Sequence, residues 1–261
     1  MCKFDRKHLK NNLNCALVTG GSRGIGNAIA KQLAWDGIHV VLIARDYNLL
    51  DSECSKIISS GGSASFISID FLSPDFMDKI KSHLIENELQ PNILINGLGG
   101  GFGSKTFDSV DVYQKVMHLN FFVSHMLMDL IVENAKRIGW GRIIHIGTLA
   151  INHKSAAAPY VAAKAAVMAY MKIVAKDLAK INENILVCAV SPGAMNVEGK
   201  YLSNLAKNHP DEFSKFLERN SVAAGRLGEP SEVARVVSFL CDRKTTYLNG
   251  CNIEIDGGAS N

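Results

Sequence analysis

The sequence predicts an α/β fold in which one domain holds a doubly wound sheet of seven parallel strands with helices on both faces. Short runs rich in β-branched residues alternate with longer segments of helical periodicity. The runs are almost continuously apolar, as in residues 185–190, which is typical of strands covered on both faces. A glycine-rich segment joins the first run directly to the first helical segment.

Seven runs bounded by Gly, Asn or Asp are predicted as strands. In chain order they are 14–19, 38–44, 65–70, 92–96, 141–147, 184–190 and 251–255. The segments between them show helical stripes, such as Ile25, Ile29 and Leu33 at four-residue steps, which we interpret as core or subunit-interface faces. The last helix is expected after Glu229, where Glu-Pro-Ser-Glu forms a helix start signal.

The length of 261 residues allows one or two domains. We find no internal repeat or Pro-rich linker, so we expect a single domain over 14–261 preceded by a short polar extension over 1–13. One helix-like polar stretch, 195–226, interrupts the rhythm after the sixth strand. Inserted segments beyond strand ends often form lids, so this stretch is predicted to be a substrate lid.

Composition and charge exclude several classes of function. The 28 Lys and Arg residues against 25 Asp and Glu leave a net charge of +3, and they are scattered, so nucleic acid is not an expected partner. The sequence has neither a signal peptide nor a run of the roughly 18 apolar residues of a membrane span, and we expect a cytoplasmic protein without a membrane partner. Six widely spaced cysteines predict no metal site, and Cys15 and Cys188 are interpreted as reduced core thiols.

The segment from Thr19 to Gly26 predicts a dinucleotide site of the Rossmann type. Glycines between a strand and a helix let the backbone turn tightly and approach a pyrophosphate, which the open N–H groups of the helix stabilise. The candidate cofactor-binding residues of this loop are Gly20, Ser22, Arg23, Gly24, Ile25 and Gly26.

The end of the second strand favours NADP(H) over NAD(H). A carboxylate there would bind the ribose 2′-OH, but the sequence has Ala44 and Arg45, and Arg45 with Arg23 offers two guanidinium groups to a 2′-phosphate. The alternative is that both arginines are solvated loop residues. After the third strand, Asp70 and Phe71 are candidate cofactor-binding residues. Asp70 could accept a hydrogen bond from the adenine amino group, and it suits a turn cap equally well.

Tyr160 and Lys164 are spaced i, i+4 at the start of a predicted helix, so both side chains share one face. A phenol is a poor base at neutral pH, but a nearby cation favours its phenolate and lowers its pKa. Tyr160 is therefore a candidate proton donor and acceptor. The alternative, for the Tyr-x-x-x-Lys spacing alone, is a chance pair on the protein surface.

From Thr19 to Gly258 the chain resembles the classical short-chain dehydrogenase/reductase family, particularly its 3-oxoacyl-carrier-protein reductase-like branch. The matching features keep the family's order. They are the Thr-Gly-x-x-x-Gly-Ile-Gly loop, Asp70, Asn96, Asn120, Tyr160-x-x-x-Lys164, Ser191-Pro192-Gly193, the run from Arg226 to Ala234, and Asn249-Gly250 followed by Asp256-Gly257-Gly258.

The resemblance implies a role for each matching residue. Tyr160 would exchange a proton with a carbonyl or alcohol oxygen, and Lys164 would hold the nicotinamide ribose and lower the pKa of Tyr160. Asn120 would place a water that links Lys164 to solvent. Pro192 and Gly193 would pack beside the nicotinamide, and Asn96 would support the fourth-strand turn near the cofactor.

Two positions depart from the family pattern. The usual catalytic serine is replaced by Thr148, whose hydroxyl has the same donor and acceptor capacity; we prefer Thr148 to Ser155, and the alternative is that Thr148 only packs. The usual Asn-Asn-Ala-Gly reads Asn96-Gly97-Leu98-Gly99, which removes a loop-tying side chain at a candidate cofactor contact, Gly97. His145 takes a position often filled by Asn, and we favour a structural hydrogen-bonding role for it.

The leading hypothesis is an NADP(H)-dependent oxidoreductase that transfers hydride between nicotinamide and a ketone, a 3-oxoacyl group or a sugar-derived carbonyl. The main alternative is a regulatory protein of the same fold that binds the cofactor with little turnover. A sugar-nucleotide epimerase or dehydratase would need more residues after Gly193 than this chain has. A homotetramer or homodimer is expected from the resemblance.

Overall fold

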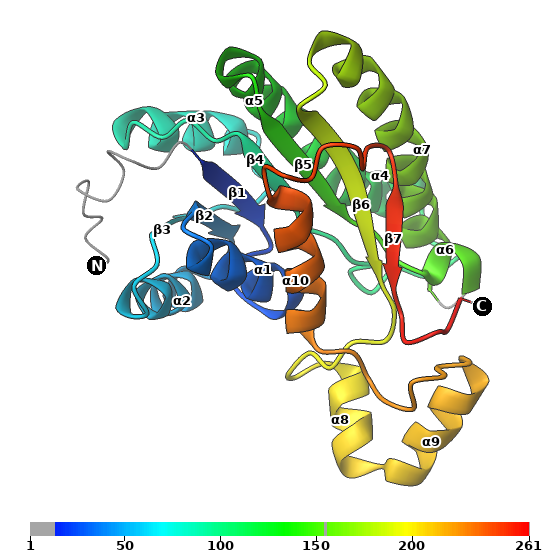
Figure 1. Ribbon diagram of the computed structural model, residues 1–261. Coiled ribbons are helices and arrows are strands. Elements are labelled where there is room, and N and C mark those ends of the chain that lie inside the picture. Colours follow the sequence, from blue (N-terminus) through cyan, green and yellow to red (C-terminus); the bar gives the residue numbers. More distant parts are fainter. Residues whose placement is uncertain (1–13, 154–155, 261) are drawn as a thin grey trace.

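The computed structural model describes residues 14–153 and 156–260, so the predicted extension over 1–13 lies outside the described residues. The chain forms one seven-stranded parallel sheet in the order β3-β2-β1-β4-β5-β6-β7. Helices cover both faces of the sheet (Figure 1). The predicted doubly wound α/β fold is therefore confirmed.

The observed strands lie within two residues of the predicted runs at each end. They are β1 (Cys15–Thr19), β2 (His39–Ala44), β3 (Ala64–Ser68), β4 (Ile93–Asn96), β5 (Gly141–Ile146), β6 (Ile185–Pro192) and β7 (Asn252–Ile255). The five inner strands and the edge strand β3 are mostly buried, whereas the other edge strand, β7, alternates between exposed and half-buried residues. The near-continuous apolar runs thus reflect strands packed on both faces.

The helices divide between the two faces. They are α1 (Gly24–Trp35), α2 (Tyr47–Ser59), α3 (Phe76–Glu86), α4 (Val110–Met117), α5 (Val123–Ile138), α6 (Ala150–His153), α7 (Ala158–Ile181), α8 (Tyr201–Asn208), α9 (Pro210–Arg219) and α10 (Pro230–Cys241). Apolar side chains of α1, α2 and α10 form one core with alternate strand residues. Those of α3, α5 and α7 form the second core with the remaining strand residues. Successive side chains along a strand point to opposite faces of the sheet, so the same strands contribute residues to both cores.

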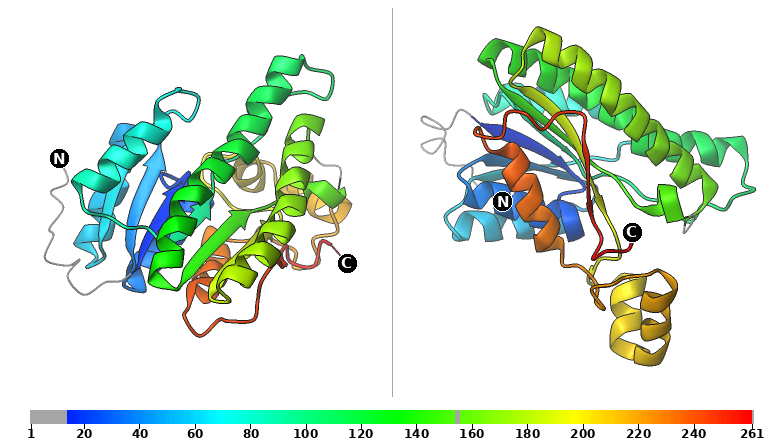
Figure 2. Two further views of the ribbon diagram at one scale, coloured as in Figure 1. Left: turned by 90° about the horizontal axis from the view of Figure 1, so that it is seen from above. Right: turned by 45° about the vertical axis from the view of Figure 1, so that its right-hand side comes forward.

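The segment predicted as a lid contains α8 and α9. The lower part of Figure 1 and the right-hand view of Figure 2 show this helix pair beyond the ends of the strands, apart from the main body. A parallel bridge between Met195 and Gly228 closes its base. The last helix, α10, begins where the start signal predicts, because Glu229 and Glu232 form a reciprocal capping box.

One helical run, Val110–Ile138, is long and apolar enough to span a bilayer by length and composition, with a mean hydropathy of 1.2. It is the one such run in the described part of the chain. The run is α4, a π-helical turn η2 (His118–Phe122), and α5, and 44% of its most apolar window is buried inside the fold. Core helices of globular proteins meet the same test, so the finding carries little weight for a membrane location.

A buried arginine joins the start of β5 to the end of α10. The Arg142 guanidinium donates hydrogen bonds to five backbone carbonyls, those of Gly141, Asn184, Leu240, Asp242 and Thr245. It also lies 4.3 Å from the ring centroid of Trp140. Burial lowers the pKa of Arg142 to about 10. The side chain therefore satisfies carbonyls at the α10 C-terminus, which the helix itself leaves without partners.

Candidate active site

A cleft of about 1080 Å³ lies at the carboxyl ends of the central strands. This is where open parallel sheets bind ligands, at the point where the strand order reverses. Most predicted site residues line it: Gly20, Ser22, Arg23, Gly24, Ile25, Gly26, Arg45, Asp70, Phe71, Gly97, Thr148, Tyr160, Lys164, Pro192 and Gly193. Asn96 and Asn120 are buried and are not among its lining residues.

The glycine loop forms the floor of one end of the cleft. Gly20 adopts φ +70°, and a Cβ there would lie 2.9 Å from the carbonyl oxygen of Gly97. A Cβ at Gly26 would clash with the carbonyl oxygen of Gly20, so both positions need glycine. Among residues 14–153 and 156–260, no side chain caps α1 at its start, Gly24. The first turn of α1, Gly24 to Gly26, lines the cleft, and its uncapped N–H groups make a cradle that fits the pyrophosphate of a dinucleotide.

The end of β2 brings two arginines and one carboxylate together. Arg45 directly follows β2 and lines the cleft. The Arg23 guanidinium lies 3.4 Å from the Asp46 carboxylate, and both side chains are at least half exposed. Asp46 also caps α2 by accepting a hydrogen bond from the Leu49 N–H. The sequence analysis assigned Arg23 and Arg45 to one phosphate and did not include Asp46. The Asp46 carboxylate offsets part of the charge of Arg23.

The third strand ends earlier than predicted, at Ser68 instead of Asp70. The Asp70 carboxylate accepts the Leu72 N–H at 3.0 Å, which is the turn-capping role considered from sequence. Asp70 still lines the cleft. Phe71 is buried, packs edge-on against Phe76, and accepts a hydrogen bond through its carbonyl from His118. These contacts fix the wall at this end of the cleft.

Asn96 supports the cleft from below. Its amide nitrogen lies 3.2 Å from Nδ1 of His145, and because an amide N–H can only donate, Nδ1 accepts. Burial, together with the nearby Lys164 charge, lowers the pKa of His145 to about 3, so this imidazole is neutral. The contact fits the structural role favoured for His145 from sequence. It also makes Asn96 a support for the β4 turn, not a lining residue.

Gly97 is required by close packing against the glycine loop. A Cβ there would lie 2.6 Å from the Thr19 carbonyl oxygen. The Thr19 hydroxyl accepts the Leu98 N–H at 3.0 Å and donates to the Ile95 carbonyl at 3.3 Å. Thr19 thus ties this loop to the sheet without the side chain that the family usually carries at position 97.

Asn120 lies in the π-helical turn η2 and holds the next part of the loop. Its side-chain oxygen accepts the Gly100 N–H at 3.0 Å, and its amide nitrogen donates to the Gly100 and Val116 carbonyls at 3.1 and 2.8 Å. The π-turn interrupts the regular helix bonds and gives the Val116 carbonyl a side-chain donor. Asn120 therefore connects η2 to the glycine-rich loop that follows β4, residues 97–103. Its role in placing a water stays a prediction.

Lys164 projects from the first turns of α7 into the cleft and is almost fully buried, with 4% of its surface exposed. Its ammonium donates to the Ile146 carbonyl at 2.8 Å and lies 6.0 Å from the centroid of the Tyr160 ring. Burial lowers the pKa of Lys164 to about 8. Gly99 leaves room for it, because a Cβ there would lie 2.9 Å from the ammonium nitrogen.

Tyr160 and Thr148 face each other across the cleft. Burial raises the pKa of Tyr160, and a hydrogen bond with the Thr148 side chain opposes that rise. From the sequence we expected Lys164 to lower the pKa of Tyr160. In the structure that pKa is raised, because burial outweighs the hydrogen bond with Thr148. The Lys164 ammonium is bound instead to the Ile146 carbonyl. The Thr148 oxygen also accepts the Ala150 N–H at 3.2 Å, which orients it. The other candidate hydroxyl, Ser155, lies outside the described residues.

The structure adds lining residues that the sequence interpretation did not single out, among them Lys115, Leu119, Val197 and Lys200. Val197 belongs to the lid segment, and its side chain would lie 3.1 Å from a Cβ placed at Gly24. Lys115 and Leu119 are four residues apart on the helical run that also carries Asn120. Their position on one helix face near Asn120 could therefore have been predicted from the sequence. Lys200 had no comparable signal, since it depends on how the lid returns to the cleft.

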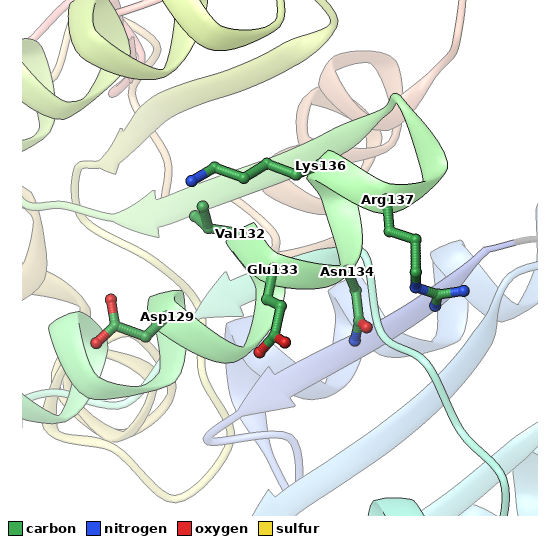
Figure 3. A pocket seen from close by; sticks show the side chains of 6 residues that line it. All are labelled: Asp129, Val132, Glu133, Asn134, Lys136 and Arg137. Carbon is green, nitrogen blue, oxygen red and sulfur yellow. The ribbon is translucent and has the colours of Figure 1, made fainter.

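A second groove, of about 690 Å³, runs along the outer side of α5 (Figure 3). It is lined by Asp129, Val132, Glu133, Asn134, Lys136 and Arg137. Two carboxylates balance the two cations, so the lining of the groove has no net charge. It is distant in sequence from the glycine loop and contains none of the predicted site residues.

The chain is similar to known proteins over nearly its whole length. The family model described as enoyl-(acyl carrier protein) reductase matches residues 20–260. A 3-oxoacyl-acyl-carrier-protein reductase of Pseudomonas aeruginosa is 28% identical over 250 residues, which cover 93% of this chain and 96% of that protein.

Solved structures of similar proteins have the same fold. L-sorbose reductase from Gluconobacter frateurii, complexed with NADPH and L-sorbose, is 27% identical, with a TM-score of 0.84 over 95% of this chain and 97% of that chain. A 7α-hydroxysteroid dehydrogenase complexed with NADH and 7-oxo glycochenodeoxycholic acid is 26% identical, with a TM-score of 0.83 over 98% of each chain. The two structures thus contain different nicotinamide cofactors, NADPH and NADH, together with different ligands.

Proposed function

Because the chain belongs to the short-chain dehydrogenase/reductase family, we propose that it is an NADPH-dependent reductase of a ketone, or the dehydrogenase of the corresponding alcohol. The single observation that carries this proposal is the convergence of Tyr160, Lys164 and Thr148 in the cleft that the glycine loop floors. The 3-oxoacyl, sugar and steroid relatives support an oxidoreductase of carbonyl and alcohol groups.

Each of the three side chains has a separate task in this proposal. The Thr148 hydroxyl donates a hydrogen bond to the substrate oxygen and fixes its position next to Tyr160. Tyr160 gives a proton to that oxygen in reduction and removes it in oxidation, and its raised pKa keeps it protonated before reduction. The Lys164 ammonium stabilises the phenolate that remains. When bound, the nicotinamide supplies or accepts the hydride.

Several observations support NADPH as the cofactor. Arg23, Arg45, Lys115, Lys164 and Lys200 line the cleft, against the carboxylates of Asp46 and Asp70. This excess of positive charge suits a dinucleotide with an additional phosphate. Arg45 has the position from which a guanidinium would meet a ribose 2′-phosphate, immediately after β2. The Asp46 carboxylate is already occupied by Arg23 and by the α2 N-terminus, which reduces its repulsion of a phosphate.

The lid and the glycine-rich loop are the proposed substrate contacts. Phe213 and Phe216 of α9 stack with ring centroids 6.5 Å apart, and no residue of α9 is fully buried. Phe102, at the cleft mouth, is about half exposed. An apolar body next to the reacting carbonyl would cover these side chains, so we propose an acyl chain or ring over a small polar ketone.

We also propose that the protein forms homo-oligomers through the outer faces of α5 and α7. Exposed apolar side chains lie on both helices and include Phe122 just before α5, Met126 and Ile173. Light scattering of the purified chain would test the proposal: a mass of one chain would contradict it.

The functional test is NADPH oxidation with a panel of 3-oxoacyl thioesters, cyclic ketones and keto-sugars. Tyr160→Phe should lower kcat at least about 100-fold with the active ketone. Tyr170→Phe, on the same helix with its hydroxyl bound to His125 outside the cleft, is the matched control and should keep its rate. Equal rates for Tyr160→Phe and wild type would overturn the mechanism. Tight NADPH binding without turnover on every substrate would favour the regulatory alternative.

Cofactor choice has a separate test. Arg45→Ala should raise KM for NADPH about 10-fold and leave KM for NADH within about twofold, because only NADPH carries the additional phosphate. An equal loss with both cofactors would show that Arg45 supports the loop instead of binding the phosphate.

A further inference from the structure

Two cysteines face each other where β6 pairs with the chain leading into the edge strand β7. Cys188 lies in β6 and Cys251 immediately precedes β7. Ala189 is in register with Asn252, and the Ala189 N–H donates to the Cys251 carbonyl. The Gly250 N–H donates to the Val187 carbonyl, which is one residue out of that register, so the chain bulges just before β7. Within this bulge the Cys251 side chain contacts that of Cys188.

Their sulfur atoms lie 3.5 Å apart on the same side of the sheet. Cys188 is buried in the core shared with α10, and Cys251 packs against the same core while remaining partly exposed. Neighbouring strands are about 4.8 Å apart, which falls within the Cα separation of about 4.4–6.8 Å that disulfides bridge. To form the bond, the two sulfurs would have to approach each other by about 1.5 Å from their present separation of 3.5 Å.

The two thiols differ in a way that suits stepwise oxidation. The Cys251 thiol lies in hydrogen-bond contact with the Cys188 sulfur, and the Cys188 thiol donates to the Leu248 carbonyl at 3.1 Å. The contact between the two thiols holds the pKa of Cys251 below its ordinary value, whereas the same contact and burial raise the pKa of Cys188. The partly exposed Cys251 is thus the thiol that ionises and meets an oxidant first. Cys15 and Cys241 are buried, and burial raises the pKa of each to about 12, so they are far less reactive.

We propose that Cys188 and Cys251 form a reversible oxidation site that takes a peroxide as oxidant and closes an intrachain disulfide. The Cys251 thiolate attacks one peroxide oxygen, the O–O bond breaks, and a sulfenic acid and one water form. The Cys188 sulfur then attacks the Cys251 sulfur, the S–O bond breaks, and the second water leaves with the remaining protons. Two thiols are oxidised by two electrons in total, and one hydrogen peroxide is reduced to two waters. A dithiol reverses the reaction by thiol–disulfide exchange.

The disulfide would fasten the edge of the sheet next to the candidate active site. Beyond the two cysteines the same strand pair continues to Gly193, whose N–H donates to the Ile255 carbonyl at 2.9 Å. The bond would join positions 63 residues apart in the sequence, so it would close a long loop that includes the lid and α10. Oxidation is expected to stabilise the folded chain and to keep the cleft wall intact under peroxide stress.

The test uses the full chain, reduced and desalted, then treated with hydrogen peroxide. Remaining thiols are alkylated, and the unreduced digest is analysed by mass spectrometry. We expect a peptide pair linked through Cys188 and Cys251, lost after dithiothreitol treatment, and a melting temperature about 5–10 °C above that of the reduced chain. Cys251→Ala should lose both the pair and the shift, whereas Cys15→Ala, the matched core control, should retain both.

Three outcomes would overturn the proposal. Cys251 could be oxidised to sulfinic acid while Cys188 remains open to alkylation. The crosslink could instead join another pair of cysteines. The Cys188–Cys251 bond could also form without any rise in melting temperature, which would remove its stabilising role. Because no ketone or nicotinamide enters the experiment, its result is independent of the proposed reductase activity.

Discussion

Replacing Lys164 by Met should raise stability at neutral pH while removing activity. Burial lowers the pKa of Lys164 from 10.5 to about 8. That fall corresponds to about 3 kcal/mol by which the fold disfavours the charged ammonium. Methionine has a similar volume and no charge, but it leaves the Ile146 carbonyl without its donor, which costs about 1 kcal/mol. The expected net gain near pH 7 is about 2 kcal/mol.

The pH dependence fixes the sign of this prediction. Because the folded chain releases the Lys164 proton at a lower pH than the unfolded chain, the unfolded state binds more protons between pH 8 and 10.5. The buried ammonium therefore lowers the wild-type free energy of unfolding in full below pH 8, and this penalty decreases as the pH rises from 8 to 10.5. The advantage of Lys164→Met should be full at neutral pH and should disappear above pH 10.5.

The assay is urea unfolding of both proteins near neutral pH and near pH 10, together with ketone reduction. Lys172→Met, an exposed lysine on the same helix, is the control and should change the free energy of unfolding by less than about 0.5 kcal/mol. The reduction rate should fall at least about 100-fold for Lys164→Met. A loss of stability at neutral pH, or a gain that persists near pH 10, would refute the reasoning.

Three further changes test other contacts. Asp46→Asn keeps a good N-cap for α2 but frees the Arg23 guanidinium, so KM for NADPH should fall about threefold or more while KM for NADH stays the same; an equal change in both would contradict this. Thr148→Val should lower kcat/KM about 100-fold and Thr148→Ser by only a few-fold, measured as initial rates; similar values for the two variants would mean that the hydroxyl only packs. Arg142→Met should lower the free energy of unfolding in urea by about 3–5 kcal/mol, because five carbonyls lose their donor and three of these hydrogen bonds are buried. Arg243→Met, also stacked on Trp140, should lower it by under about 1 kcal/mol; equal losses would refute the stabilising role of the Arg142 hydrogen bonds.

The fold was largely predictable because its signals are local. Apolar strands and glycine punctuation placed the seven strands within two residues at each end, and the start signal at Glu229 placed α10. The third strand ended two residues early because Asp70 turns the chain by accepting the Leu72 N–H. That choice between strand end and turn depends on geometry that a single sequence does not specify.

The site was predictable only where the chemistry follows fixed spacing. Tyr160 and Lys164 share a helix face by their i, i+4 spacing, and both line the cleft. The π-turn around Asn120 depends on bonds with Gly100, twenty residues earlier, and has no local sequence signal. The pKa of Tyr160 depends on how deeply the cleft buries it, which spacing does not encode. The pairing of Cys188 with Cys251 required the strand register.

The bond pair between Asn120 and the backbone of Gly100 divides the β4–α4 connection into two parts. The stretch from Gly97 to Gly100 is bound to Thr19 of β1 and to Asn120 of η2. The part from Gly101 onward contains Gly103 and the exposed aromatic residues Phe102 and Phe107. Changes in length or sequence beyond Gly101 would therefore alter which substrates fit and leave the proton-transfer groups undisturbed. Such a boundary offers a place where new specificity can be selected or engineered without rebuilding the chemistry.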